Sequence, residues 1–159
     1  MPFTFSHPAV VIPLIKANIR LSSTALIVGS IIPDFEYFIR MNGESYYSHT
    51  ISGLFWFDVP LAIIVCFIYH LVVRDSLFVN LPDFLKERFS IYKKFNWINY
   101  FKRNWPIILF SIIIGAGTHL IWDGFTHETI FYIEQADLTN MFRIGRINLA
   151  GYKFLQMAS

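Results

Sequence analysis

Two long apolar stretches dominate the hydrophobic pattern of the chain. Residues 51–73 contain one acid, Asp58, and residues 105–122 contain no Lys, Arg, Asp or Glu. At a rise of about 1.5 Å per residue, such helices reach, or nearly reach, across a hydrocarbon core of about 30 Å. The pattern predicts two membrane-spanning helices, the second bracketed by Trp105 and Trp122 as interfacial aromatics often are. Two helices buried against a larger soluble partner are the alternative.

The N-terminal apolar stretch predicts a helical hairpin and not a third span. Residues 8–32 are largely apolar, but Lys16 and Arg20 lie near their middle, where a single span would bury both cations at the costliest depth. Residues 18–23 read as a break between two shorter helices, and Pro33 ends the second. We therefore expect a hairpin that enters or lies on the membrane and returns to its starting side.

The composition supports the same class of protein. Of 159 residues, 55% are hydrophobic, 18% aromatic and only 15% charged. A soluble domain of this size exposes too much surface for such an apolar excess. Together these values argue against a soluble globular enzyme, a disordered regulator and a DNA-binding domain, and the single cysteine, Cys66, excludes a disulfide framework or a multi-cysteine zinc site. The predicted fold class is an all-α polytopic membrane helical bundle.

The distribution of charge predicts the orientation in the membrane. Residues 74–104 hold seven of the thirteen Lys and Arg residues, whereas residues 123–142 have four acids and no cation. Because positive loops stay cytoplasmic, the first span runs inward and the second returns. Aromatic residues interleave with these cations, which predicts a segment lying on an anionic lipid surface. Nucleic-acid binding is discounted because the aromatic residues adjoin a span directly.

The organisation that we expect is one membrane domain over residues 1–159, with the lipid bilayer as its partner and no prediction of oligomeric state. Its parts are a hairpin and site loop (1–50), a first span (51–73), a basic interfacial loop (74–104), a second span with its His-x-x-x-Asp-x-x-x-His pattern (105–127) and a flank (128–159).

Six histidine and aspartate residues fall where this topology predicts a single, extracytoplasmic face: His7, Asp34, His49, His119, Asp123 and His127. The last three are spaced i, i+4, i+8, so they share one side of a helix, with Asp123 placed between the histidines. Imidazole and carboxylate ligands without thiolates suit a divalent metal, most simply zinc, with manganese or iron as alternatives. Capping or interfacial groups hydrogen-bonded inside a bundle are the alternative interpretation.

A metal centre of this kind predicts hydrolysis by metal-activated water, with Asp34 or Asp123 as the catalytic carboxylate that bridges or orients the metals. The expected substrate is a phosphoester or another lipid-accessible bond. The alternative is a non-catalytic membrane protein whose cluster serves metal storage, transport or assembly.

The motifs that carry a family resemblance are Met1-Pro2-Phe3-Thr4-Phe5-Ser6-His7-Pro8, Ile32-Pro33-Asp34, Tyr47-Ser48-His49-Thr50 and His119-Leu120-Ile121-Trp122-Asp123-Gly124-Phe125-Thr126-His127. Together they resemble an uncharacterised bacterial membrane family of unknown function, over nearly the whole chain. Their order is also similar to that in inner-membrane metal-dependent hydrolases and, more distantly, in zinc-dependent phospholipase C. The resemblance implies zinc binding by the six residues and a place in the inner membrane. The late His-x-x-x-Glu pair of the phospholipases is missing, and family members continue through further helices, so a truncated product is a further expectation.

Four other polar or small residues carry expectations. Asp58 is interpreted either as functional or as an ion-pair partner of the hairpin cations. Glu36 is expected to be a solvated flank residue with general base as its other role, and Gly115 and Gly117 are expected at close helix contacts.

Overall fold

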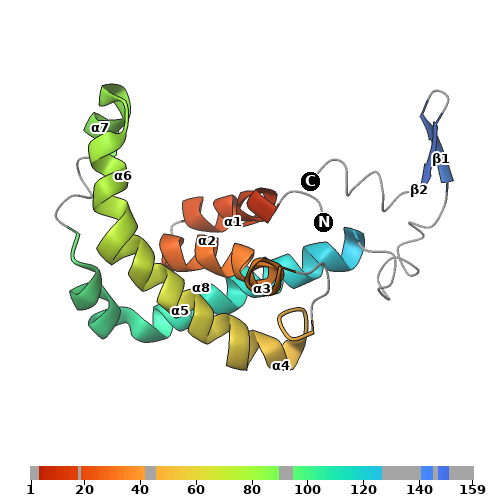
Figure 1. The fold of residues 1–159 in the computed structure, drawn as a ribbon, viewed down its shortest axis with the longest axis horizontal. Coiled ribbons are helices and arrows are strands. Elements are labelled where there is room, and N and C mark those ends of the chain that lie inside the picture. Colours follow the sequence, from red (N-terminus) through yellow and green to blue (C-terminus); the bar gives the residue numbers. More distant parts are fainter. Residues whose placement is uncertain are drawn as a thin grey trace.

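The computed structural model describes residues 4–17, 19–41, 46–89, 95–126, 141–144 and 147–150. Through Thr126 the ordered elements are all helices, as the sequence predicts (Figure 1). A two-stranded antiparallel hairpin follows, in which β1 (Met141–Ile144) pairs with β2 (Ile147–Ala150), and the sequence pattern did not predict it.

The N-terminal region is a helical hairpin. After the short 3₁₀ turn η1 (Thr4–Ser6), α1 (His7–Lys16) and α2 (Ser23–Ile31) are separated at the predicted break. Pro33 lies in the 3₁₀ turn η2 (Ile32–Asp34), and α3 (Phe35–Arg40) follows. His7 at the start of α1 and Asp34 after α2 both lie beside Asp123 and His119, so the hairpin returns to the end from which it began.

A continuous helical run occupies residues 51–80. It consists of α4 (Ile51–Gly53), the π-helical segment η3 (Leu54–Asp58), α5 (Val59–Ile68), a second π-helical segment η4 (Tyr69–Val73) and α6 (Arg74–Asn80). The run continues past the predicted end of the first span at residue 73, because α6 extends the same helix into the basic segment. A short helix, α7 (Asp83–Phe89), follows. The π-helical segments hold Asp58 and His70, which are both buried.

The last long helix, α8 (Trp97–Thr126), begins earlier than the predicted start at residue 105. It is bent at Asn104, whose φ of −126° and ψ of 20° are not helical. Pro106 explains the bend, because its ring clashes with the carbonyl one turn back and it cannot donate a helical hydrogen bond.

Helices α2 and α8 form the centre of the bundle and run parallel. The N–H of Ser22 donates to Ser111 Oγ at 2.9 Å, and His119 Nδ1 lies 2.7 Å from the carbonyl oxygen of Ser30. Both bonds join residues 89 positions apart, so the two helices lie side by side in the same direction.

The close approach of these helices depends on glycine. A Cβ built at Gly115 would lie 2.5 Å from the carbonyl oxygen of Leu26, and one built at Gly29 would lie 2.5 Å from that of Ile112. The prediction for Gly115 is therefore confirmed. The prediction for Gly117 is wrong, because nothing lies within 4 Å of the position that its Cβ would occupy.

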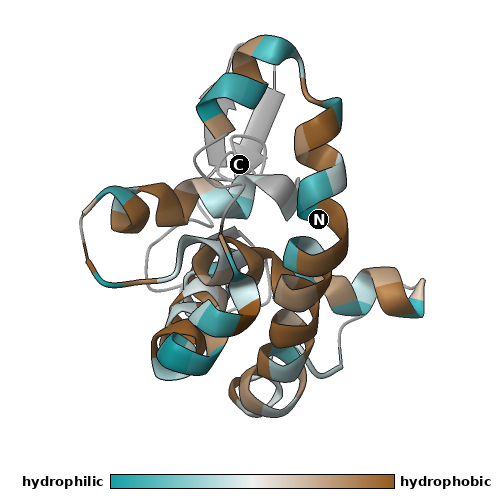
Figure 2. Cartoon of the chain, turned by 90° about the vertical axis from the view of Figure 1, so that its left-hand side faces the viewer, coloured by the Kyte–Doolittle hydropathy of each residue, from teal (hydrophilic) through white to brown (hydrophobic). Residues whose placement is uncertain are grey.

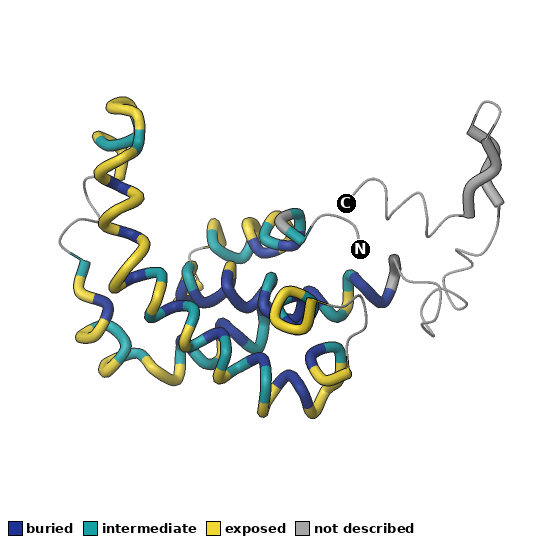
Figure 3. Tube along the Cα trace, in the orientation of Figure 1, coloured by how far each residue is buried: buried dark blue, intermediate teal, exposed yellow. Residues whose placement is uncertain are grey.

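Two helices, Ile51–Asn80 and Trp97–Gly124, are long and apolar enough to cross a membrane. Their most apolar windows are only 28% and 33% buried within the protein, whereas the core helix of a soluble protein is mostly buried. Many residues of these helices are coloured hydrophobic (brown) in Figure 2, and a number of them are coloured exposed (yellow) in Figure 3. Exposed examples include Ile64, Ile68, Leu71, Val72, Phe110 and Ile121.

Candidate metal centre

Four ionisable side chains from three regions of the chain meet at one end of the α2–α8 pair. Asp34 comes from η2, His49 from the loop before α4, and His119 and Asp123 from successive turns of α8. One potential ligand atom from each lies within 4.8 Å of all the others. All but His49 are buried, and His49 keeps 21% of its side chain exposed. This cluster, Asp34–His49–His119–Asp123, could hold a metal ion.

The histidine–aspartate distances within the cluster are close to the spacing of ligands around one small ion. His49 Nε2 lies 3.3 Å from Asp123 Oδ2 and 4.0 Å from Asp34 Oδ1, and His119 Nε2 lies 3.5 Å from each of these oxygens. Nitrogen and oxygen ligands bound tetrahedrally at about 2.0–2.2 Å lie about 3.3–3.6 Å from one another. Three of these four nitrogen–oxygen distances fall in that range, and all four ligand atoms lie within 4.8 Å of one another, so the set would have to contract to surround one ion.

The imidazole of His119 is oriented by the backbone of α2. Its Nδ1 is 2.7 Å from the carbonyl oxygen of Ser30, and because a carbonyl only accepts, Nδ1 carries the proton. Nε2 then presents its lone pair to the cluster, and it has no hydrogen-bond partner among the described residues. A ligating histidine is commonly fixed in this way, with its second nitrogen donating to a carbonyl or carboxylate.

His49 is oriented by a relay that ends on Glu36. The hydroxyl of Ser48 donates to Glu36 Oε2 at 2.9 Å, so its oxygen is left to accept from His49 Nδ1 at 3.0 Å. His49 Nε2 is thereby directed to Asp34 and Asp123 as an acceptor. The imidazoles of both clustered histidines thus carry the tautomer that metal binding requires.

Glu36 is not the solvated flank residue that the sequence suggested. Its side chain is 1% exposed, and its carboxylate accepts hydrogen bonds from the N–H groups of Tyr46, Tyr47 and Ser48 in addition to the Ser48 hydroxyl. Burial alone would raise the pKa of Glu36, but these hydrogen bonds lower the pKa to about 2. A carboxylate so fully occupied anchors the loop that carries His49, and it is a poor general base.

The Asp34 carboxylate is held in its charged form. Burial opposes the charge, yet the neighbouring His119 and Thr4 side chains lower the pKa of Asp34 below its usual value. Neither of its oxygens makes a hydrogen bond of good geometry to a described residue. Asp34 is therefore a buried anion whose lone pairs remain available to an ion.

His7 lies against the cluster without belonging to the set of four. Its ring stacks on that of His119 with centroids 3.9 Å apart, and its Nε2 is 3.7 Å from Asp123 Oδ1. Burial and the neighbouring His119 lower the pKa of His7, which favours the neutral imidazole that a metal requires.

The other residues singled out from the sequence fall into three groups. His127 lies outside the described residues. His70, the remaining described histidine, lies apart from the cluster, and its Nε2 is 3.1 Å from Thr24 Oγ1. Asp58 is fully buried and makes no ion pair with a described residue, which overturns its pairing with the hairpin cations. The ionisable groups near enough to influence it are instead His119 and Glu36.

The sequence did not predict the residues that orient the ligating histidines, Glu36 and Ser48 among them. The spacing of Glu36 two residues after Asp34, and of Ser48 directly before His49, was visible in the sequence. What could not be read from it is that the residues just before His49 lie against Glu36, so that Tyr46 and Ser48 donate to its carboxylate.

The fold and the cluster together define a helical protein with two apolar helices of membrane-spanning length and a buried two-histidine, two-aspartate cluster. The chain belongs to the DUF4184 family, described as a domain of unknown function, which it matches over residues 1–159. The predicted resemblance to an uncharacterised family is confirmed, since the family's function is unknown. The resemblance to hydrolases stays a prediction. No curated protein and no solved structure matches the chain.

Proposed function

We propose that the Asp34–His49–His119–Asp123 cluster binds a divalent metal ion. The observation that carries the proposal is the convergence of four ligand atoms within 4.8 Å of one another. Two imidazoles oriented by hydrogen bonds and a buried carboxylate with free lone pairs support it further. Without a cation, two carboxylates in this confined space would repel each other.

Zinc is the metal that this ligand set favours, with manganese or iron as alternatives. Imidazole nitrogen and carboxylate oxygen are borderline to hard ligands, and no thiolate is present to select a softer ion. The single cysteine of the chain, Cys66, is buried elsewhere, in the hydrophobic core.

The reaction we propose is hydrolysis of a phosphoester or another lipid-accessible bond. The metal would supply Lewis acidity and activate water. Asp34 and Asp123 would hold it, while the Ser30 carbonyl and the Glu36–Ser48 relay would fix the ligating histidines. The partial exposure of His49 supports access of water and substrate from that side.

A non-catalytic metal site is the second candidate. Four protein ligands complete a tetrahedral shell, and His7 stands close by as a fifth. Closed, fully protein-ligated shells are typical of structural sites, whereas catalytic ones keep a position open. The fit of four ligands to one ion favours metal storage, transport or a structural role.

Metal content tests the proposed site. Full-length protein purified without chelators and reconstituted with zinc should contain stoichiometric metal by elemental analysis. Asp123→Asn, which removes one ligand charge while keeping its volume, should lose most of it. A metal at a hundredfold excess over its Kd stabilises the folded state by about 2.7 kcal/mol, so a chelator should lower the melting temperature of the unsubstituted protein only.

His70→Gln is the matched control, because His70 is also a buried helical histidine but lies outside the cluster. It should retain its metal. Equal metal content in the Asp123→Asn variant and the unsubstituted protein would exclude the site. Metal that is retained without hydrolysis of a phosphodiester or phospholipid would favour the non-catalytic function.

We propose further that the protein is a multi-pass protein of the inner membrane with the cluster on the extracytoplasmic side. The low burial of both apolar helices supports the membrane, and the basic segment 74–104 supports the orientation. In a Cys66→Ala background, cysteines placed at Lys93 and Asp137 should react with impermeant reagents from opposite sides of the membrane. Reaction of both from one side would contradict the orientation.

A further inference from the structure

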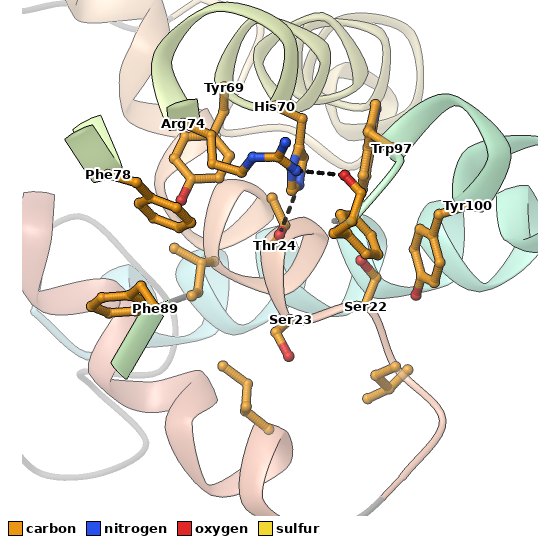
Figure 4. Close-up of a pocket in the computed structure, with 14 residues that line it drawn as sticks. Ser22, Ser23, Thr24, Tyr69, His70, Arg74, Phe78, Phe89, Trp97 and Tyr100 are labelled. Carbon is orange, nitrogen blue, oxygen red and sulfur yellow. Dashed lines mark hydrogen bonds between the residues drawn. The ribbon is translucent and has the colours of Figure 1, made fainter. Parts of the chain in front are cut away.

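A second polar site lies at the other end of helix α2. A cavity of about 490 Å³ opens between the α2 N-terminus, η4 and α6, and the start of α8. Figure 4 shows His70, Arg74 and Thr24 in its wall, with Phe78 and Phe89 to one side and Trp97 and Tyr100 to the other. A cavity of this size is within the range that holds small molecules or lipid headgroups.

The first turn of α2 faces this cavity and lacks a side-chain cap. Ser22 occupies the N-cap position with φ −84° and ψ 111°, but its side chain makes no capping bond. Ser22, Ser23 and Thr24 all line the cavity. The N-terminus of a nine-residue helix carries uncompensated N–H groups and the positive end of the helix dipole, which favour an anion.

Arg74 supplies a positive charge at the same place. Its side chain is only 9% exposed, and it is held by the Phe95 carbonyl at 2.8 Å and by Asp75, also at 2.8 Å. Asp75 is 74% exposed, and its Oδ1 lies 2.8 Å from both Nε and Nη2 of Arg74, so this ion pair occupies one edge of the guanidinium. Nη1 and Nη2 each carry a second N–H, and a guanidinium fixed in a cavity wall can donate these hydrogens to a phosphate.

His70 is the second buried polar group in the wall. It is 7% exposed, stacks on Trp97 with centroids 4.2 Å apart and is bonded to Thr24 through Nε2. Its Nδ1 has no hydrogen-bond partner among the described residues. A buried imidazole with one unused nitrogen, beside an uncapped helix start and a buried arginine, indicates that a polar ligand completes the site.

We propose that this cavity binds the phosphate group of an anionic amphiphile such as the headgroup of a phosphatidic-acid-type lipid. The α2 N-terminus, Thr24, His70 and Arg74 would hold the phosphate. The aromatic walls formed by Phe78, Phe89 and Tyr100 would contact the apolar part of the ligand. The site is independent of the metal centre, because it lies at the opposite end of α2 and shares no residue with it.

Binding by short-chain lipids tests the proposal. Full-length protein in detergent, with EDTA present so that a metal cannot bind phosphate, is titrated with dioctanoyl phosphatidic acid, dioctanoyl phosphatidylcholine or inorganic phosphate. The shift of the melting temperature gives an apparent Kd for each. Phosphatidic acid should bind about tenfold or more tightly than either of the others, which lack the charged monoester or the chains.

Two substitutions test whether phosphatidic acid binds in this cavity. Arg74→Gln should weaken phosphatidic acid binding about tenfold, the loss expected for one charge-assisted hydrogen bond, and Thr24→Val should weaken it in the same direction. Arg103→Gln, which removes an exposed arginine of α8, is the matched control and should leave binding unchanged.

Several outcomes would overturn the proposal. Equal binding of phosphatidylcholine would exclude a phosphate monoester, and equal binding of inorganic phosphate would exclude the apolar part of the ligand. An equal loss in the Arg103→Gln variant would show binding by general surface charge. If Arg74→Gln does not fold, unchanged affinity in folded Thr24→Val protein would be sufficient to reject the site.

Discussion

Replacing Glu36 by glutamine should destabilise the protein and loosen its metal centre together. The Glu36 carboxylate accepts from the backbone N–H groups of Tyr46, Tyr47 and Ser48, and Arg40 adds a bond at 3.3 Å. Each oxygen accepts at least one backbone N–H. A glutamine has one oxygen and one NH₂ group, so in either orientation at least one backbone donor would face another donor.

The size of the destabilisation follows from the number of hydrogen bonds that the substitution removes or weakens. A donor left without an acceptor costs about 1–3 kcal/mol, and the bonds that remain lose their charge assistance, roughly halving their strength. The expected loss is about 3 kcal/mol of unfolding free energy, or about 6–12 °C in Tm for a chain of this size. Because Ser48 links Glu36 to His49, the metal affinity should also fall by about 10- to 100-fold, as it does when groups behind a ligand are removed.

The pH dependence of the unfolding free energy follows from the lowered pKa of Glu36. Glu36 has a pKa of about 2 in the folded protein against an ordinary value of 4.5, so the folded state favours its charged form. The stabilisation is fully present above pH 4.5 and is lost as the pH falls towards 2. The stability difference between the unsubstituted protein and the Glu36→Gln variant should narrow over that interval.

Thermal melting in detergent and a competition assay for zinc measure the two effects. Glu87→Gln, on the exposed surface of α7, removes the same charge without disturbing this loop and is the control. If Glu36→Gln melts within about 1 kcal/mol of Glu87→Gln, the loop is not anchored as described. If it is destabilised but binds zinc with undiminished affinity, the relay to His49 is wrong.

The remaining prediction compares two glycines of α8. Gly115→Ala should destabilise the protein by about 1–3 kcal/mol or more, because its Cβ would lie 2.5 Å from the Leu26 carbonyl oxygen and 2.8 Å from the Ser30 nitrogen. Gly117→Ala should be neutral or stabilising by up to about 1 kcal/mol, because open space surrounds that position and alanine is the better helix former. Equal melting temperatures for the two variants would contradict the close α2–α8 contact.

The helical class and the hairpin could be read from the sequence because their signals are local. Two cations in the middle of an apolar stretch are incompatible with one span, and the structure separates α1 and α2 at that place. The ends of the long helices were less predictable. Charged residues mark where a membrane span ends but do not stop a helix, so the first long helix continues to Asn80 and α8 starts at Trp97.

The cluster could be anticipated in part. His119 and Asp123 share a helix face by their spacing, and the returning hairpin brings Asp34 to the same end. The roles of Ser30 and Glu36 could not be inferred, because each depends on a contact between segments distant in sequence or on the path of a loop. Sequence periodicity places residues on a face, but it does not show which backbone carbonyl or N–H that face will meet.

The dipole of helix α2 explains why the two proposed sites bind ions of opposite charge. The partial positive charge of its N-terminus lies at the cavity with Arg74, and the partial negative charge of its C-terminus lies where the Ser30 carbonyl meets His119. Asp34 follows that negative end, and both it and Asp123 are buried there. Two buried carboxylates beside the C-terminus of a helix are unfavourable unless positive charge is added, and the histidines can add it only by giving up the lone pairs that they direct at the cluster. A divalent cation at this end removes the conflict and keeps both imidazoles neutral, whereas the opposite end of the same helix favours an anion.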